Sequence, residues 1–274
     1  MTGLGKLLTV AVVATAMTAA SAAGSAARQA PRPGAPAHEQ QAGMAADGPT
    51  VITLDTYIAF KRGAALRGTD GDGARVAATY GWRARDPQGI CSQDLSLEAI
   101  VPDLFIDRDN LPGSARSASI RARVGGSTIY EDRTDSIYLI SLDVTDCAGN
   151  MTTEDGGAGT ALRQEDEATY SGGWVSGRCE CYSGQGVRKT TTPGASATFT
   201  FSGRSIGVVM PQAPNRGTVR ILVDGRQRDR INLAGPTRNR VVVASYVLPD
   251  AGPHTIKVVS VDSKQVDIDA FIVS

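Results

Sequence analysis

Short runs of alternating apolar and polar residues, separated by glycine, proline and asparagine, dominate this chain from residue 50 onward. Successive side chains of a β-strand point to opposite faces of a sheet, so each such run predicts a strand with one buried face. The clearest run covers residues 76–84, where apolar side chains, including Trp82, occupy every even position. No segment shows the longer period of an extended amphipathic helix. The pattern therefore predicts an all-β protein.

The predicted strands fall into two groups of about 100 residues each. Strands at this spacing, divided by turn residues, are typical of β-sandwiches. We therefore expect two tandem β-sandwich domains, at residues 50–153 and 165–274, joined by a linker at residues 154–164.

The N-terminal residues have the features of an export signal. Lys6 precedes a short apolar stretch at residues 7–20, and a small-residue cleavage site ends at Ala22. Residues 1–22 are therefore predicted to be a signal peptide. Residues 23–49 are rich in alanine, proline and glycine, which predicts a disordered spacer. We expect a secreted protein, extracellular or associated with the cell wall, and we predict no transmembrane segment.

The charge balance limits the classes of partner. The 28 basic and 28 acidic residues cancel, so the overall field favours neither nucleic acid nor an anionic membrane. A local arginine cluster, Arg226, Arg228 and Arg230, has the parity of one strand face. Such a face could bind an anionic glycan or a cell-wall polymer such as teichoic acid through bidentate contacts. Ordinary solvation of a surface strand would explain it equally well.

The four cysteines of an exported chain predict disulfides, with three possible connectivities. Pairing within each half is the simplest choice and gives Cys91–Cys147 and Cys179–Cys181. The second pair encloses one residue, so it would form either a staple on a loop or a reducible redox pair.

Two segments of the first predicted domain end in characteristic turns. Residues 82–90, from Trp82 to Ile90, contain an Asp-x-x-Gly turn, and residues 144–150, from Val144 to Asn150, end in Asp-x-Ala-Gly-Asn. In both features the domain resembles the immunoglobulin-like repeats of secreted bacterial proteins. The resemblance implies an immunoglobulin-like fold and assigns no function.

The second predicted domain contains a series of short motifs. They are EDE at 165–167, YSGGW at 170–174, GASATF at 194–199, VDG at 223–225, GPHT at 252–255 and VDIDAF at 266–271. With these motifs the domain resembles the galactose-binding-like jelly rolls of secreted bacterial proteins, which include carbohydrate-binding modules. The resemblance covers almost the whole domain. It implies a jelly-roll fold but no particular ligand, because such modules bind sugars, other partners, or nothing yet identified.

The same resemblance implies a structural calcium ion. Such modules often hold calcium between acidic residues of the first strand and an aspartate of the last. Glu165, Glu167 and Asp269 occupy the matching positions, and alternation would place the two glutamates on one side of a strand. A solvated acidic end of the domain is the alternative.

Sugar binding requires an exposed aromatic platform beside polar groups. Trp174 and Tyr182 flank residues 175–181, a loop that the second cysteine pair would stiffen. Burial of Trp174 in the core is the alternative, and the exposure of this residue distinguishes the two interpretations.

Catalytic motifs are lacking in this sequence. A serine hydrolase needs a base beside its nucleophile, and His254 is the one histidine left outside the predicted signal and spacer. We therefore expect a protein that is not an enzyme and that binds a glycan or cell-wall polymer through residues 165–274. The alternative is a structural or protein–protein adhesion module without a sugar site.

Overall fold

The computed structural model of the chain describes residues 51–68, 74–99, 104–124 and 136–274. The predicted signal peptide (1–22) and spacer (23–49) lie outside the described residues. Nearly all of the described chain is β-structure, with two short 3-10 turns, η1 (Glu165–Glu167) and η2 (Ser183–Gln185). The prediction of an all-β protein built from β-sandwiches is confirmed. Among the described residues, no helix is long and apolar enough to span a membrane.

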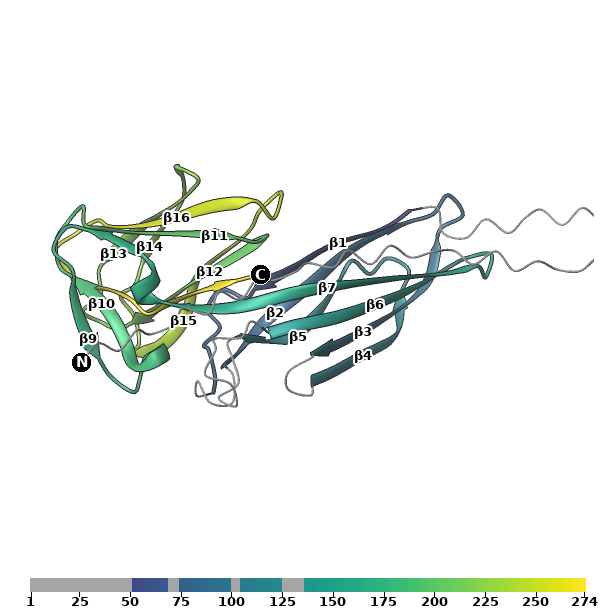
Figure 1. Ribbon diagram of the computed structural model, residues 1–274, viewed down its shortest axis with the longest axis horizontal. Helices are drawn as coiled ribbons and strands as arrows, with labels where there is room; N and C mark the ends of the chain where they lie inside the picture. The colour runs from purple at the N-terminus through teal and green to yellow at the C-terminus, as the bar shows by residue number, and fades with distance from the viewer. Residues whose placement is uncertain (1–50, 69–73, 100–103, 125–135) are drawn as a thin grey trace, which may run out of the picture. The chain divides into compact units, whose positions relative to one another are not determined.

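The N-terminal sandwich consists of two facing layers of antiparallel strands (Figure 1). One layer is a three-stranded sheet in the order β1-β2-β5, formed by β1 (Val51–Phe60), β2 (Ala74–Arg85) and β5 (Ser117–Val124). The other has the order β7-β6-β3-β4, formed by β3 (Ile90–Ala99), β4 (Leu104–Pro112), β6 (Ser136–Asp146) and β7 (Met151–Gln164).

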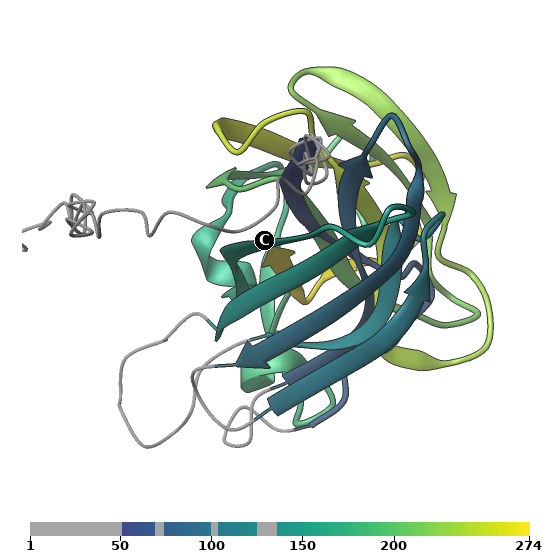
Figure 2. The same cartoon turned by 90° about the vertical axis from the view of Figure 1, so that its right-hand side faces the viewer.

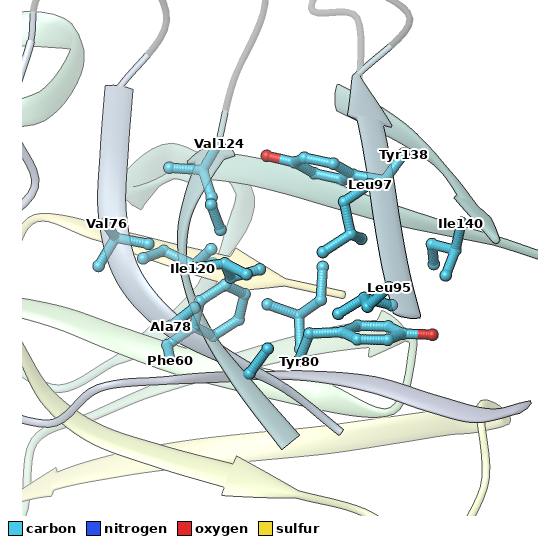
Figure 3. Close-up of a cluster of buried hydrophobic side chains, with 14 of the residues drawn as sticks. Phe60, Val76, Ala78, Tyr80, Leu95, Leu97, Ile120, Val124, Tyr138 and Ile140 are labelled. Carbon is cyan, nitrogen blue, oxygen red and sulfur yellow. The ribbon is translucent and has the colours of Figure 1, made fainter. Parts of the chain in front are cut away.

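The core of this sandwich follows the alternation seen in the sequence. Tyr80 of β2 and Leu97 of β3 come from opposite layers and are both buried, with Ile120 of β5 beside them (Figure 3). Trp82 is 2% exposed, and its indole Nε1 donates a hydrogen bond to Oε1 of the buried Gln93 at 2.8 Å. Burial of these large side chains from both layers supplies most of the stability of such a sandwich.

A disulfide joins Cys91 at the start of β3 to Cys147 after β6. The backbone N–H of Cys147 also donates to the carbonyl of Gly89, so the two turn regions are tied by a covalent bond and a hydrogen bond. The Asp146 carboxylate accepts hydrogen bonds from the backbone N–H groups of Ala148 and Asn150, which closes the second turn.

The C-terminal sandwich contains the remaining strands, which form curled sheets (Figures 1 and 2). A five-stranded sheet has the order β14-β13-β16-β11-β8, and a small one has the order β17-β10-β9. The strands are β8 (Thr169–Ser171), β9 (Val175–Arg178), β10 (Gly186–Thr190), β11 (Ser196–Ser202), β12 (Ser205–Gln212), β13 (Thr218–Val223), β14 (Arg226–Asn232), β15 (Arg238–Val247), β16 (Pro253–Ser260), β17 (Val266–Ile268) and β18 (Ala270–Val273).

Strand β7 belongs to both sandwiches. It pairs with β6 from Met151 to Thr160 and with β18 from Ala161 to Gln164, which produces one seven-stranded sheet in the order β15-β12-β18-β7-β6-β3-β4. The sequence instead suggests a linker at residues 154–164. Glycines 156, 157 and 159 interrupt the side-chain alternation there, but strand pairing uses backbone groups, which glycine also carries.

Candidate functional site

An aromatic pair lies where β8 ends and β9 begins. The rings of Tyr170 and Trp174 have centroids 5.1 Å apart and are inclined at 58°. Both side chains are partly exposed and pack against the edge of the C-terminal core. Trp174 is thus neither fully buried nor fully exposed, and one part of its ring remains available to a ligand.

A sharp turn at Gly172 brings the two aromatic residues together. Gly172 has φ +91°, and a Cβ atom at this position would lie 2.7 Å from the Cβ of Ala195. Only glycine satisfies both the left-handed backbone and the close approach. The indole Nε1 of Trp174 then donates to the carbonyl of Ser171 at 3.1 Å, which fixes the orientation of the ring.

A cation completes this group of side chains. The guanidinium carbon of Arg188 in β10 lies 5.4 Å from the centroid of the Tyr170 ring. The Tyr170 hydroxyl donates to the carbonyl of Glu165 at 2.6 Å, and burial together with the Glu165 carboxylate raises the pKa of Tyr170, which therefore stays neutral. Tyr170, Trp174 and Arg188 together form what we call the aromatic patch. Partly exposed rings beside a hydrogen-bond donor are suited to binding a sugar ring.

Tyr182 does not join this patch. Residues 175–178 form β9, which pairs with β10, so Trp174 and Tyr182 lie at opposite ends of a hairpin. Four residues of extended chain span about 13 Å. The predicted platform of Trp174 and Tyr182 is therefore not assembled, and the neighbour of Trp174 is Tyr170. The YSGGW motif contains both residues, but only the Gly172 turn reveals that their rings meet.

The tip of the hairpin is held by a disulfide and by one arginine. Cys179 is bonded to Cys181, as the pairing within each half predicts. The Arg240 guanidinium donates to the carbonyls of Glu180, Cys181 and Tyr182 at 2.8, 3.2 and 2.8 Å. The fork of one guanidinium thus fixes three consecutive peptide groups.

The arginine cluster of β14 does not share one face. Val223 pairs with Arg226 and Arg220 pairs with Arg230, with a register shift between them. Because Val223 is buried and Arg220 is exposed, their partners Arg226 and Arg230 lie on opposite faces of the sheet. Arg228 occupies the bulge and has no cross-strand partner in this register. The extra residue of the bulge reverses the alternation on which the prediction of a common face depended.

The predicted calcium ligands are not brought into one cluster. Glu165 and Glu167 lie in the 3-10 turn η1 rather than in a strand, and the Glu167 carboxylate accepts a hydrogen bond from the backbone N–H of Gln164. Asp269 is buried, and its Oδ1 accepts from the backbone N–H of Ser183 at 2.8 Å. Within the described ranges, no group of three or more histidine, cysteine or acidic side chains could hold a metal ion.

Comparisons with known proteins match part of this chain to one protein family and to one curated relative. Residues 175–269 match the family described as the N-terminal domain of carbohydrate esterase family 2. A curated relative from Flavonifractor plautii, an A type blood alpha-D-galactosamine galactosaminidase, is 26% identical over 150 residues. That alignment covers 54% of this chain and 14% of the relative, so the chain spans a small part of the relative's length.

Solved structures give weaker similarities. A CBM36-1 domain of a multidomain xylanase from the hindgut metagenome of Trinervitermes trinervoides is 17% identical, with a TM-score of 0.32 over 42% of this chain and 96% of that chain. A family two carbohydrate esterase from Cellvibrio japonicus is 13% identical, with a TM-score of 0.33 over 42% of this chain and 33% of that chain. Both scores are low.

The prediction that the protein is not an enzyme is contradicted. The curated relative is a galactosaminidase, and the matching family model is named for a carbohydrate esterase. The prediction rested on missing sequence motifs. Such an absence does not decide the question, because the two carboxylates of a glycosidase act from positions that need no fixed spacing in the sequence.

Proposed function

We propose that this chain is part of a carbohydrate-active protein and that its C-terminal sandwich binds glycan at the aromatic patch. The match of residues 175–269 to the carbohydrate esterase family 2 N-terminal model is the observation that carries this proposal. The matched range begins one residue after Trp174 and includes Arg188, so two members of the patch lie in or beside it.

The geometry of the patch supports the same proposal. An aromatic ring that is fixed by its own hydrogen bond costs little conformational entropy when a sugar packs on it. The Arg188 guanidinium beside the ring offers donors to hydroxyl oxygens of the sugar. Export from the cell, as the N-terminal sequence predicts, is part of the proposal, because polymeric glycans are then accessible to the protein.

The test uses the full chain in a glycan-binding screen that includes galactosamine-containing and neutral galactose oligosaccharides. We expect binding that weakens at least about tenfold in Trp174→Ala and in Arg188→Gln, because each removes a direct contact. Arg178→Gln removes the same charge from the exposed end of β9 and is the matched control. Equal binding by Arg188→Gln, Arg178→Gln and the unaltered protein would show that the patch is not the glycan site.

Hydrolysis is measured on the same preparation, because the relatives include a galactosaminidase and an esterase. Release of sugar from galactosaminides or of acetate from acetylated sugars would extend the proposal from glycan binding to glycan cleavage. A folded protein that neither binds nor cleaves any glycan in the screen would overturn the proposal as a whole.

A further inference from the structure

A groove formed mainly by the N-terminal sandwich, with Arg238 of β15 at its wall, concentrates positive charge. It has a volume of about 610 Å³, and six exposed basic side chains line it; no acidic side chain is among the described residues of its wall. These side chains define what we call the basic groove: Lys61, Arg62, Arg67, Arg75, Arg121 and Arg238. Small residues of the same wall, including Ala64 and Ala77, leave the space open.

The backbone of the groove is fixed in advance. Residues 61–68 leave β1 and run beside β15, to which they are tied by three hydrogen bonds. Gly63 N donates to Val242 O, Val242 N donates to Ala64 O, and Leu66 N donates to Arg240 O, each at 2.8 Å. A site whose backbone needs no ordering loses little conformational entropy when a ligand binds.

Two of the six cations already have partners. Arg62 forms an ion pair with Asp229 at 2.6 Å, and Arg238 donates to the carbonyl of Gly63 at 2.7 Å. For Lys61, Arg67, Arg75 and Arg121, no ion pair with another described side chain is found. These four positions come from three segments, namely residues 61–68, β2 and β5, so their charges are distributed along the groove.

Repulsion within the groove favours an anionic ligand. Arg67 and Arg75 are directly opposite each other in a two-residue β-bridge, with hydrogen bonds of 2.9 and 2.7 Å between their backbones. Arg121 pairs with Ala77 and therefore lies diagonally across from Arg75 on the same face. Like charges directly opposite on one sheet face are destabilising, and a bound anion would relieve this cost.

We infer that the basic groove binds the negatively charged groups of an acidic polysaccharide. Guanidinium groups pair with carboxylate and sulfate oxygens in a bidentate manner. No aromatic side chain of the described chain lines the groove, so the stacking platform that single-stranded nucleic acid requires is lacking. The choice of a sugar polymer rests on the proposed function, but the groove is separate from the aromatic patch.

The test is titration of the full chain with oligogalacturonate, with a heparin-derived oligosaccharide, with a neutral galactose oligosaccharide and with short single-stranded DNA. We expect at least one acidic oligosaccharide to bind, with affinity that falls as salt is raised. Oligogalacturonate carries carboxylates alone, whereas the heparin-derived probe carries carboxylates and sulfates. Binding of both probes would show that carboxylates are sufficient, and binding of the heparin-derived probe alone would assign the contact to sulfate. The Arg75→Gln/Arg121→Gln variant should weaken this binding at least about tenfold, because it removes two charge-assisted hydrogen-bond donors.

The control variant is Arg220→Gln/Arg230→Gln, which removes the same charge from the C-terminal sandwich and should leave the affinity unchanged. Thermal unfolding of both variants verifies that they are folded. Equal binding by the groove variant, absence of binding to both acidic probes, or preference for DNA would overturn the inference. If the groove inference fails in this way while the groove variant still binds neutral sugar, the inference about the groove is wrong and the proposed function still stands.

Discussion

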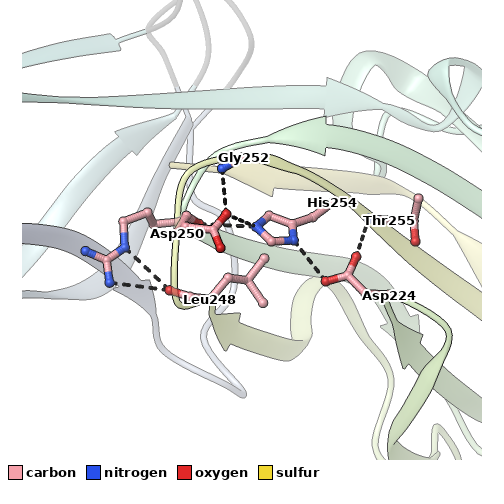
Figure 4. A network of polar contacts seen from close by, with 7 residues as sticks. Asp224, Leu248, Asp250, Gly252, His254 and Thr255 are labelled. Carbon is pink, nitrogen blue, oxygen red and sulfur yellow. Dashed lines mark hydrogen bonds and ion pairs between the residues drawn. The ribbon is translucent and has the colours of Figure 1, made fainter.

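The Nδ1 atom of His254 in β16 lies 2.9 Å from the Oδ2 atom of Asp224, in the tight turn between β13 and β14 (Figure 4). On its other side, Nε2 of the same ring lies 3.2 Å from the carbonyl oxygen of Asp250 and 3.3 Å from the Asp250 carboxylate. The imidazole is buried between two turns and holds them together. His254 is therefore a structural residue, and its environment favours the protonated form.

This contact predicts that stability depends on pH. Burial of His254 alone would lower its pKa, but the hydrogen bonds and charges of Asp224 and Asp250 outweigh burial and raise it above 6.5. A raised histidine pKa stabilises the fold fully below the unfolded value, and this contribution is lost as pH rises through the folded value. The melting temperature should therefore be higher at about pH 5.5 than at about pH 8.5. In His254→Gln this difference in melting temperature between the two pH values should shrink. If it does not shrink, other titratable groups cause the pH dependence.

Asp224 sets the lower end of the pH range in which its contact with His254 stabilises the fold. The hydrogen bond from the backbone N–H of Thr255 is the main cause that lowers the pKa of Asp224 below 3.8, and His254 adds to it. The contribution of Asp224 is thus present above this value and lost as pH falls through its folded pKa. The pair should stabilise the protein most between about pH 4 and pH 6.5.

Side-chain alternation was sufficient to predict the sandwiches but not the strand that joins them. In strands such as β2, every second residue is apolar, and several of these residues are large, including Tyr80 and Trp82. Their burial on one face of the sheet makes the alternation easy to recognise in the sequence. Where β7 pairs with β6, Gly157 lies opposite Leu139 and Gly156 lies opposite Ile140. The glycines of β7 therefore do not show the side-chain alternation that β6 shows. The shared sheet depends on backbone pairing over a long distance in the chain, and no local pattern contains that information.

The candidate sites show a similar division. The aromatic residues of the patch are visible in the YSGGW motif, but the meeting of Tyr170 with Trp174 depends on the turn at Gly172. The predicted arginine face of β14 was wrong because a bulge at Arg228 shifts the register by one residue. The basic groove brings together Arg67, Arg75 and Arg121, whose proximity follows from the bridge between Arg67 and Arg75 and from the pairing of β2 with β5.

The buried amide of Gln93 predicts a large loss of stability on its removal. Its Oε1 accepts from Trp82, and its Nε2 lies 3.0, 3.2 and 3.1 Å from the carbonyl oxygens of Pro112, Gly113 and Ala115. Gln93→Leu would leave the buried indole N–H of Trp82 without its acceptor. It would also remove one donor from each of the three carbonyls, which keep their hydrogen bonds from the Ala115 N–H and the Arg116 guanidinium. We expect the free energy of unfolding to fall by about 3 kcal/mol, measured by urea denaturation. Gln88→Leu, at an exposed position, is the control and should change the free energy of unfolding little. Equal urea midpoints for the Gln93→Leu and Gln88→Leu variants would contradict the prediction.

The disulfide between Cys91 and Cys147 predicts a second large effect. It closes a loop with a sequence separation of 56 residues. In the chain-entropy account, opening such a loop costs about 4 kcal/mol of stability, whereas opening the two-residue separation of Cys179–Cys181 costs less than half as much. Denaturation of Cys91→Ser/Cys147→Ser beside Cys179→Ser/Cys181→Ser measures the difference. Equal losses in the two double variants would show that loop closure does not govern stability here.

Arg240 predicts a local effect at the hairpin tip. Its guanidinium donates to the carbonyls of Glu180, Cys181 and Tyr182, and also to the carbonyl of Gly68 at 2.9 Å. One side chain thus ties residues 179–182 to the segment that borders the basic groove. A lysine carries one ammonium group and cannot reproduce this fork.

In Arg240→Lys we expect faster amide hydrogen exchange at residues 179–185 and a loss of about 2 kcal/mol in local stability. Arg238→Lys, which affects a single carbonyl contact, should leave exchange at the tip unchanged. If both variants gave the same exchange rates there, the disulfide alone would be sufficient to hold the tip, and Arg240 would have no part in ordering it.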